Sequence, residues 1–542
     1  MMIKRVPAGQ TAPQTVRDAT LDLLRGFGMD RVFGNPGSTE LNLLGDWPAD
    51  IPYILGLQEA CVVGMADGYA QATGNAAFVN LHSAAGVGHA LGNLFTAFRN
   101  KTPMVVTAGQ QSRSLLAMQP FLYAEQAPEF PKPYVKWSVE PARAADVPAA
   151  IARAYHVAME HPRGPTFVSV PSDDWMAAAG PVPARSVAYG FGPDGAAISV
   201  LRDAIARSAR PAFVVGPDVD RSGAVDLMVE LAERTRAAVW ASPMSSRASF
   251  PERHPLFSGF LQAAPEPLAA ALASYDLISV IGAPVFTFHV EGHCGVLHDG
   301  TPIWQITADP TEAAVAAAGG SILSTIRPAL AALLDGLGAT DRAAPAPRPQ
   351  PPEPKAADPI PAPFLLHLIS GLLPERAIVV EEAPSHRPAI QRHLPMAGAD
   401  SFYTMASGGL GYSLPASIGV SLARRDRRTV CLIGDGSAMY SIQALWTAAQ
   451  HRLPITVIVL NNGGYGAMRA FSRSMQIRNA PGIDLPGIDF VGLAVAMGCR
   501  AARAGSAAGL PEALRHAFAE PGPYLLEVPV DSGTVQLYGA EH

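Results

Sequence analysis

The chain has 542 residues and a mass of 56.7 kDa, and at roughly 150 residues per domain this predicts about three or four domains rather than one core. Hydrophobic residues make up 49% and charged residues 16%, a composition typical of a globular protein with buried sheets. The formal net charge is −6 and no Lys/Arg cluster stands out, which argues against a nucleic-acid-binding surface.

The first block, residues 1–180, alternates short β-rich runs with alanine-rich stretches. "AAFVNLHS" and "PMVVTAG" are predicted strands, with a helix over "GVGHALGNLFTAFRN" between them. Ser38 falls in a tight turn after "DRVFG", Glu59 begins an amphipathic helix after "YILGL", and His82 ends the strand "AAFVNLH". Burial disfavours the charged form of a carboxyl such as Glu59, as a proton-sharing group requires.

Each of these three side chains also has a plain structural interpretation. Serine is a routine turn residue, a glutamate at a helix N-terminus is favoured by the macrodipole, and a histidine at a strand end is more often structural than catalytic. The residues alone leave both interpretations of Ser38, Glu59 and His82 open.

The middle block, residues 195–340, follows a weaker break over "AGPVPARSVAYGFGPDG". Its predicted strands are "AFVVG", "AAVWAS" and "LISVIGAP". His289 follows "VIGAPVFTF" and is a second histidine beyond a strand. It too is either structural or catalytic.

A proline-rich segment, "APAPRPQPPEPKAADPIPAP", separates the middle block from residues 361–542. Proline at this density favours extended chain, so residues 341–360 are predicted to be a linker. The last block has strands over "AIVVEE", "TVCLIGDG" and "PITVIVLNN", with a helix over "SIQALWTAAQ". Strand and helix alternate in all three blocks, which predicts an α/β protein of three doubly wound parallel-sheet domains.

Two polar turns stand at the ends of neighbouring strands in the last block. Asp435 lies in "GDG" after "TVCLI", and Asn462 lies in "NNGG" after "PITVIVL". Open α/β sheets bind ligands at the carboxyl ends of their strands, so these side chains are expected to converge. A carboxylate, an amide oxygen and a carbonyl of the next turn suit Mg²⁺.

The glycines around Asp435 allow the backbone to approach a phosphate, and Ser437 is predicted to open a helix whose N-terminal amides favour an anion. A lone GDG is more often only a tight turn. The downstream asparagines favour a diphosphate–metal clamp.

GDG followed by NN resembles the thiamin diphosphate signature. The three blocks resemble the pyrimidine-binding, central and diphosphate-binding domains of the 2-oxo acid decarboxylase and acetolactate synthase superfamily. Within it the chain is most similar to the benzoylformate decarboxylases. The segments that carry this likeness are "GNPGSTE", "LQEACVVGMADGYAQ", "NLHSAAG", "TAGQQSR", "GAPVF", "SGGLGYSLPA" and "GIDFVGLA".

The resemblance implies thiamin diphosphate and Mg²⁺ as cofactors, with roles for particular residues. Glu59 would hold the far ring nitrogen of the aminopyrimidine, and Leu410 would be the apolar wedge between the two cofactor rings. The implied metal ligands are Asp435, Asn462 and the Gly464 carbonyl. The other implied cofactor contacts are Ser385, Gly408, Gly436, Ser437 and Tyr465.

The resemblance also implies the reaction, which is nonoxidative decarboxylation of an aromatic 2-oxo acid through a carbanion and enamine of the cofactor. Benzoylformate would give benzaldehyde and CO₂, with aldehyde carboligation as a side reaction. Ser38 would hold the substrate carboxylate, His82 would protonate its carbonyl oxygen, and His289 would protonate the later enamine.

Several positions depart from the benzoylformate pattern. Arg387 would admit a more polar acid or face solvent, and three other neighbours differ from the expected residues. Phe121, Met468 and Phe471 would keep the pocket apolar. The remaining departures are Pro384, Thr404 and Met405.

An acetolactate synthase-like carboligase is the alternative, disfavoured by the His82/His289 pair. A binding module without activity would be expected to lack Glu59 or the clamp. The resemblance further implies a homotetramer, a dimer of dimers with active sites at subunit interfaces. Separated cysteines in apolar runs, and the absence of a secretory or membrane-spanning run, predict a cytoplasmic protein.

Overall fold

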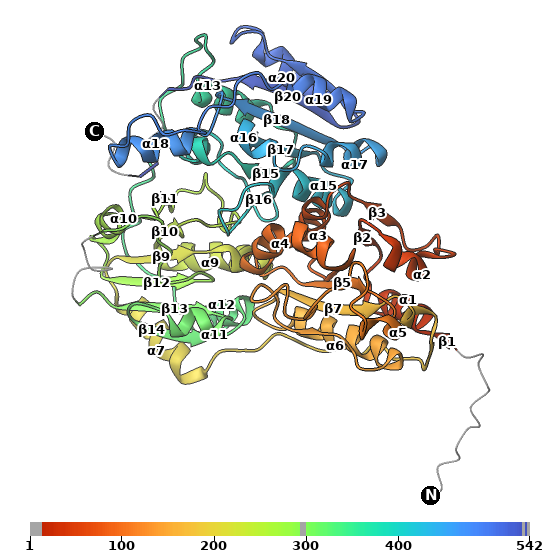
Figure 1. The fold of residues 1–542 in the computed structure, drawn as a ribbon. Coiled ribbons are helices and arrows are strands. Elements are labelled where there is room, and N and C mark those ends of the chain that lie inside the picture. Colours follow the sequence, from red (N-terminus) through yellow and green to blue (C-terminus); the bar gives the residue numbers. More distant parts are fainter. Residues whose placement is uncertain (1–13, 293–299, 534–536, 539–542) are drawn as a thin grey trace, which may run out of the picture. The chain divides into compact units, whose positions relative to one another are not determined.

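The computed structural model describes residues 14–292, 300–533 and 537–538, which fall into two compact units. Unit 1 comprises Met1–Ala70 and Asn75–Ala188, and unit 2 comprises Gln71–Gly74 and Tyr189–His542. Unit 1 contains one six-stranded sheet and unit 2 contains two, all with parallel pairing (Figure 1). The predicted α/β class with three parallel sheets is confirmed.

The sheet of unit 1 has the order β3-β2-β4-β5-β7-β6. Its predicted central strands are present as β4 and β5, both buried along their length. The six strands are β2 Val32–Gly34, β3 Tyr53–Leu55, β4 Ala77–Leu81, β5 Met104–Gln110, β6 Ser138–Val139 and β7 Pro165–Pro171.

Helices flank this sheet, and local sequence explains where the first of them begins and ends. Thr15 caps α1 in a capping box with Asp18, and Gly28 ends it in a left-handed conformation. The helices of unit 1 are α1 Val16–Phe27, α2 Leu41–Leu44, α3 Glu59–Thr73, α4 Ser83–Arg99, α5 Arg113–Leu116 and α6 Val147–Met159. A two-stranded antiparallel pair, β1 Gln14–Thr15 with β8 Ala178–Ala179, completes the unit.

The prediction that the helix beginning at Glu59 is amphipathic is wrong. α3 begins at Glu59, but all side chains over residues 61–70 are buried. The segment is rich in alanine, with two valines, two glycines and one methionine. Its Asp67 is buried and bonded to Asn100 and Thr102, so over 61–70 the helix presents no polar face to solvent.

The central sheet of unit 2 has the order β11-β10-β9-β12-β13-β14. Successive residues of β9 enter different cores: Phe213 and Val215 pack in one, and Ala212 and Val214 in the other. This explains the uninterrupted apolar run, because both faces are covered. The strands are β9 Pro211–Val215, β10 Ala238–Ala241, β11 Phe257–Phe260, β12 Leu277–Ile281, β13 Ile303–Thr307 and β14 Gly320–Leu323. The helices are α7 Gly195–Arg207, α8 Pro217–Arg221, α9 Val225–Thr235, α10 Pro265–Leu272, α11 Pro310–Ala314 and α12 Ile326–Leu334.

The second sheet of unit 2 has the order β16-β15-β17-β18-β20-β19. It too has a core on each face, with Val379 of β15 on one and Val380 on the other. Its strands are β15 Ile378–Glu382, β16 Phe402–Thr404, β17 Thr429–Gly434, β18 Ile455–Asn461, β19 Arg500–Arg503 and β20 Tyr524–Pro529. Its helices are α13 Ala362–Leu372, α14 Arg387–His393, α15 Ser413–Ala423, α16 Asp435–Ala438, α17 Ala444–Gln450, α18 Gly466–Ser474, α19 Phe490–Ala496 and α20 Leu510–Ala519.

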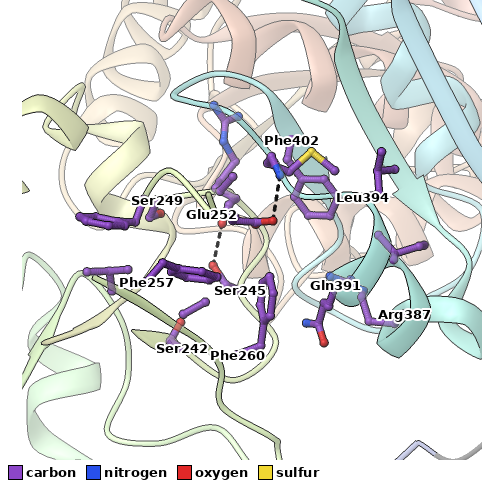
Figure 2. A pocket seen from close by; sticks show the side chains of 17 residues that line it. Ser242, Ser245, Ser249, Glu252, Phe257, Phe260, Arg387, Gln391, Leu394 and Phe402 are labelled. Carbon is purple, nitrogen blue, oxygen red and sulfur yellow. Dashed lines mark hydrogen bonds between the residues drawn. The ribbon is translucent and has the colours of Figure 1, made fainter. Parts of the chain in front are cut away.

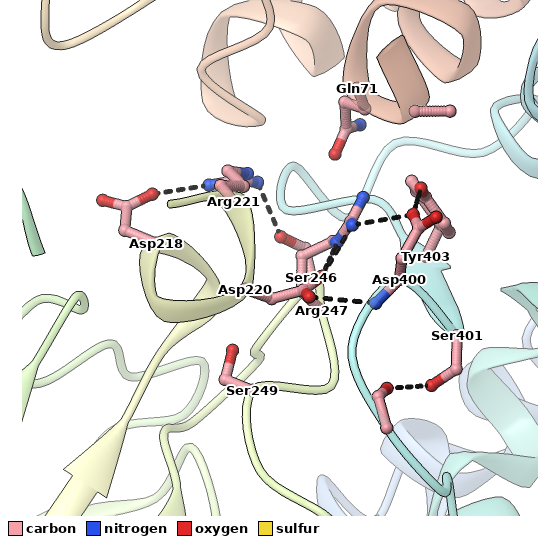
Figure 3. A network of polar contacts seen from close by, with 12 residues as sticks. Gln71, Asp218, Asp220, Arg221, Ser246, Arg247, Ser249, Asp400, Ser401 and Tyr403 are labelled. Atoms are coloured by element: carbon pink, nitrogen blue, oxygen red, sulfur yellow. Dashed lines mark hydrogen bonds and ion pairs between the residues drawn. The ribbon is translucent and has the colours of Figure 1, made fainter. Parts of the chain in front are cut away.

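A buried ionic network joins the two sheets of unit 2 (Figure 3). The guanidinium of Arg247 lies 2.6 Å from the carboxylate of Asp220 and 3.6 Å above the ring of Tyr403. The backbone N–H of Asp400 also donates a hydrogen bond to the carboxylate of Asp220 at 3.0 Å. Burial alone lowers the pKa of Arg247, but Tyr403 and the two carboxylates raise it above its ordinary value. The network therefore anchors the loop after β10 to the strand β16.

Glu252 makes a second connection between these sheets (Figure 2). Its carboxyl accepts a hydrogen bond from the backbone N–H of Met396 at 2.9 Å. In return, the backbone N–H of Glu252 donates to the carbonyl oxygen of Met396 at 3.0 Å. It lines a cavity of about 30 Å³, which is large enough for ordered water. Burial raises the pKa of Glu252 to about 8.

Three cysteines lie in the described part of the chain. Cys61, Cys431 and Cys499 are buried and form no disulfide, while Cys294 lies outside the described residues. Among the helices that the structure describes, none has both the length and the apolar character to cross a bilayer.

Candidate active site

The ends of β17 and β18 bring the predicted clamp residues together. The two strands pair in parallel up to Gly434, so Asp435 and Asn462 follow neighbouring strand ends. The Asp435 carboxylate accepts a hydrogen bond from the backbone N–H of Gly464 at 2.8 Å. The aspartate of the first turn is thereby held against the second turn.

These groups have the donor chemistry that a magnesium ion requires. Asp435 and Asn462 are only 3% and 8% exposed. Burial raises the pKa of Asp435, and hydrogen bonds from backbone N–H groups oppose that rise. Within the described residues no three His, Cys, Asp or Glu side chains gather as a metal site. An ion here would be held by one carboxylate and neutral oxygens, a set that suits Mg²⁺ completed by phosphate oxygens.

Arg469 of α18 fixes the turn that follows β18. Its guanidinium donates to the carbonyl oxygens of Asn462 at 3.2 Å and Gly463 at 2.9 Å, and it pairs with Asp484 at 2.6 Å. The turn is thus restrained independently of any ligand. No sequence pattern around Arg469 predicts this contact.

Close packing around two glycines forms a cradle next to the clamp. A Cβ on Gly436 would lie 2.5 Å from the ring of Tyr465. A Cβ on Gly466 would lie 2.7 Å from the amide nitrogen of Asn462 and 2.8 Å from the hydroxyl of Ser385. That hydroxyl also accepts a backbone N–H from the first turn of α18 at 2.9 Å. The predicted contacts Ser385, Gly436 and Tyr465 therefore border the two turns, whose glycines would let backbone N–H groups approach a phosphate.

The prediction of one continuous helix opened by Ser437 and running over 441–450 is wrong. Asp435 begins α16, which is a single turn containing the buried Ser437, and α17 begins only at Ala444. The backbone N–H groups of Tyr440 and Ser441 bond to carbonyls three residues earlier. These tight turns interrupt the helical ladder, so no long helix stands behind Ser437.

Gly408 and Leu410 lie in the glycine-rich turn between β16 and α15, held by a carboxylate. Glu382, the last residue of β15, accepts hydrogen bonds from the backbone N–H groups of residues 411–413 at 2.6, 2.8 and 2.7 Å. Burial raises the pKa of Glu382 to about 7, against the effect of those bonds. Leu410 packs against the apolar cluster on this face of the sheet. Glu382 is a residue that sequence reasoning missed.

Glu59 lies in unit 1, at the first position of α3. It is 9% exposed, and its two carboxyl oxygens contact different side chains. One lies 3.3 Å from the amide nitrogen of Asn35 and the other 3.1 Å from Nδ1 of His89. The carboxyl group of Glu59 is thus held in place by two side-chain contacts.

His82 is the residue that precedes α4, and its side chain contacts a carboxylate that the sequence analysis did not consider. Its Nδ1 lies 2.9 Å from Glu40, which is fully buried. Glu40 also accepts backbone N–H bonds from Gly37 at 2.8 Å and Gly109 at 3.0 Å. A carboxylate held in this way accepts from Nδ1–H, so Nε2 is the nitrogen left for other partners.

Ser38 begins the 3₁₀ turn Ser38–Glu40, so the same turn carries the predicted serine and the carboxylate on His82. The only signal for Glu40 in the sequence is an acidic residue two positions after that serine. This spacing does not by itself predict the contact with His82, because that contact forms only when the strand ends of the sheet lie side by side.

His289 lies in unit 2, exposed in the loop after β12. Its Nδ1 is 2.7 Å from the hydroxyl of Tyr538, and its ring meets that of Phe471 edge-on with centroids 5.4 Å apart. Tyr538 was also missed, because the C-terminal residues carry no recognisable motif. The structure thus places predicted site residues in both units, with Ser38, Glu59 and His82 in unit 1 and the remainder in unit 2.

Arg387 neither stands alone nor faces solvent freely. It forms an ion pair with the buried Glu381 at 2.9 Å and donates to the hydroxyl of Thr404 at 3.0 Å. Its charge is thus largely compensated within the fold. Among the residues expected to keep the pocket apolar, Phe121 is 88% and Met468 52% exposed. Of the other departures, Pro384 begins a 3₁₀ turn and Met405 is buried.

Three family models match the chain in sequence. The N-terminal thiamine pyrophosphate-binding domain matches residues 14–127, the central domain of these enzymes 198–333, and the C-terminal binding domain 383–528. Together they cover most of the chain.

Individual relatives match nearly its whole length. A benzoylformate decarboxylase from Pseudomonas aeruginosa is 43% identical over 96% of this chain and 99% of its own. A putative acetolactate synthase large subunit from Mycobacterium tuberculosis is 31% identical over 95% of this chain and 98% of its own.

Solved structures of relatives have the same fold. The benzoylformate decarboxylase of Polynucleobacter necessarius has a TM-score of 0.94 at 38% identity, and the 4-hydroxybenzoylformate decarboxylase of Rhodococcus jostii has 0.93 at 41%. Each covers 96% of this chain and 99% of its own. With its three matched domains and its full-length relatives, the chain belongs to the thiamine pyrophosphate enzyme family.

Proposed function

We propose that the protein is a thiamin diphosphate- and Mg²⁺-dependent decarboxylase of aromatic 2-oxo acids, with benzoylformate giving benzaldehyde and CO₂. The observation that carries this proposal is the joining of the Asp435 turn to the Asn462–Gly464 turn by a 2.8 Å hydrogen bond. It occurs in a chain that is 43% identical to a benzoylformate decarboxylase. Carboligation of the aldehyde is a proposed side reaction.

The residues present fit the cofactor. Asp435, Asn462 and the Gly464 carbonyl would hold Mg²⁺, and the backbone at Gly436 with Ser385, Ser437 and Tyr465 would border the diphosphate. The Gly408 carbonyl and the Leu410 side chain would contact the rings. When bound, thiamin diphosphate supplies a carbon nucleophile and an electron sink for decarboxylation.

Four side chains would direct the substrate and its protons. Glu59 would keep a proton at the far nitrogen of the pyrimidine ring, and the Ser38 hydroxyl would hold the substrate carboxylate. His82 would donate a proton to the substrate carbonyl oxygen, with the Glu40 carboxylate compensating the positive charge of the protonated ring. His289 would supply the proton that replaces CO₂ on the product carbon.

The larger organisation is also proposed. Residues 1–180, 195–340 and 361–542 would be the pyrimidine-binding, central and diphosphate-binding domains, with 341–360 as linker. Glu59 of one subunit would serve the clamp of another, so that a homo-oligomer, a dimer of dimers, builds the complete site. We propose a cytoplasmic location.

A substrate panel tests the reaction. The purified protein, supplied with thiamin diphosphate and Mg²⁺, is given benzoylformate, 4-hydroxybenzoylformate and pyruvate, and CO₂ and aldehydes are measured. We expect turnover of the aromatic acids and little of pyruvate. The likeness to acetolactate synthases favours one second candidate, a carboligase. Acetolactate from pyruvate, with no aldehyde from the aromatic acids, would establish that candidate and overturn the decarboxylase.

A further inference from the structure

Tyr538, near the C-terminus, contacts His289, a predicted catalytic histidine. The hydroxyl of Tyr538 lies 2.7 Å from Nδ1 of His289, and the two ring centroids are 5.7 Å apart at 79°. Tyr538 lies beyond residue 528, where the match to the C-terminal family domain ends. The Tyr538 side of the contact therefore lies outside the matched domain.

A third ring completes the arrangement. Phe471 of α18 meets His289 edge-on with centroids 5.4 Å apart, and its ring lies 6.4 Å from that of Tyr538 at an angle of 39°. The backbone N–H of His289 donates to the carbonyl of Ala263 at 2.8 Å, which fixes the loop. The exposed imidazole can still rotate about its side-chain bonds, and within the described residues its ring contacts Tyr538 and Phe471.

The hydrogen bond has a chemical consequence. Burial raises the pKa of Tyr538, with Arg387 opposing the rise, so the phenol is neutral at working pH. A neutral phenol donates to an unprotonated ring nitrogen. Nδ1 of the neutral imidazole then acts as the acceptor, and the proton resides on Nε2.

We propose that Tyr538 is a positioning residue that fixes the orientation and tautomer of His289, so that Nε2–H faces the reacting carbon. This inference rests on the proposed function of His289. In this arrangement Nε2–H gives its proton to the reacting carbon, Nδ1 takes up the phenol proton of Tyr538, and water returns a proton to the phenol, so that aldehyde is released. A freely rotating imidazole leaves the carbon longer for attack on a second aldehyde. Tyr538 thereby sets the ratio of aldehyde to carboligation product.

The first test needs no cofactor and no turnover. Diethyl pyrocarbonate modifies unprotonated imidazole, and mass spectrometry gives the rate for each histidine in the cofactor-free protein. In Tyr538→Phe, which removes only the hydroxyl, we expect His289 to react about 2- to 10-fold faster, the equivalent of one lost hydrogen bond. The exposed His89 is the internal reference. An unchanged rate at His289 would show that the contact is absent and overturn the proposal.

The second test measures product partition and pH dependence in the loaded enzyme. We expect Tyr538→Phe to lower kcat about tenfold with KM little changed. We also expect it to raise the ratio of benzoin to benzaldehyde and to move the pH profile of kcat. Tyr155→Phe is the matched control, because it loses a comparable 2.9 Å bond, to Asn75, and should behave as wild type.

The two tests separate the possible failures. If no aromatic 2-oxo acid is decarboxylated but His289 reacts faster in Tyr538→Phe, the proposed function fails while the contact stands. If turnover is present and both partition and pH profile match wild type, the positioning role is overturned.

Discussion

At the scale of single residues, the site depends on carboxylates that position other groups. Glu40 accepts hydrogen bonds from two backbone N–H groups in addition to its contact with His82. The Asp435 carboxylate is likewise held by backbone N–H groups, independently of any bound ion. Buried and fixed acceptors of this kind keep their partners oriented without reorganising during the reaction.

We predict that Glu40→Gln lowers kcat about 10- to 100-fold while thiamin diphosphate stays bound. Glutamine keeps the size of the side chain but removes the charge that compensates a protonated His82. Steady-state kinetics with benzoylformate and cofactor retention on gel filtration provide the measurement. Glu140→Gln, which alters a carboxylate bonded to Ser169 at 2.7 Å, is the control. Wild-type kcat in Glu40→Gln would contradict the role.

We predict that Asp435→Ala weakens the binding of Mg²⁺ and thiamin diphosphate at least about tenfold. The change removes the charged ligand of the proposed clamp. Calorimetric titration of the cofactor in the presence of Mg²⁺ measures the affinity. Asp426→Ala removes an exposed carboxylate paired with Arg376 and should leave affinity unchanged. Equal affinities in the two variants would count against the clamp.

At the scale of elements, two short turns and one strand end do most of the positioning. A side chain is excluded at Gly436, after β17, by Tyr465 from the turn after β18, and at Gly466 by Asn462 and Ser385. Glu382 at the end of β15 orients the glycine-rich turn through three consecutive N–H groups. Neighbouring parallel strands end at one edge, so short turns suffice to build the cradle.

We predict that Gly466→Ala reduces cofactor affinity with little loss of fold stability. Its Cβ would meet Asn462 at 2.7 Å and Ser385 at 2.8 Å, so both must move. Calorimetric titration and thermal unfolding of the cofactor-free protein report the two effects. Gly371→Ala, in α13 with open space around it, should keep affinity and gain about 0.5–1 kcal/mol. Unaltered affinity in Gly466→Ala would show that the cradle tolerates a side chain.

At the scale of the whole molecule, the two sheets of unit 2 are connected through polar groups that are buried or partly buried. Arg247 with Asp220 and Asp400 forms one connection, and Glu252 with Met396 forms the other. Removing one partner of such a buried pair is strongly destabilising, although the intact pair adds little. These contacts explain why the central and C-terminal sheets form one compact unit despite the proline-rich segment between them.

Glu252 makes unit 2 sensitive to pH. Its pKa in the folded protein is about 8, above the ordinary 4.5. Folding retains the proton between these values, so its stabilising effect is complete below about pH 4.5 and is lost as pH rises toward about 8. We predict that Glu252→Gln, which cannot ionise, loses less stability across this window, by about 1 kcal/mol or more.

Thermal unfolding at about pH 5 and about pH 8.5 measures the difference. Glutamine still accepts the Met396 N–H, so the contact itself is preserved. The exposed Glu129→Gln should follow wild type. Parallel pH profiles for Glu252→Gln and wild type would place the ionisable group elsewhere.

The order of strands and helices was predictable from the sequence, because apolar runs and turn residues act locally. "TVCLIG" and "PITVIVL" are apolar throughout because both faces of their sheet are covered. GDG and NN directly follow these two strands, which are neighbours in the sheet. Local signals also placed Glu59 at the start of its helix.

Only the tertiary structure decided which side chains meet. Glu40 contacts His82, Glu382 holds residues 411–413 and Tyr538 reaches His289 across long stretches of sequence. No local pattern encodes a contact between distant residues, because it depends on how strand ends and loops are packed. The same packing divided the predicted helix behind Ser437, which the sequence alone presents as continuous.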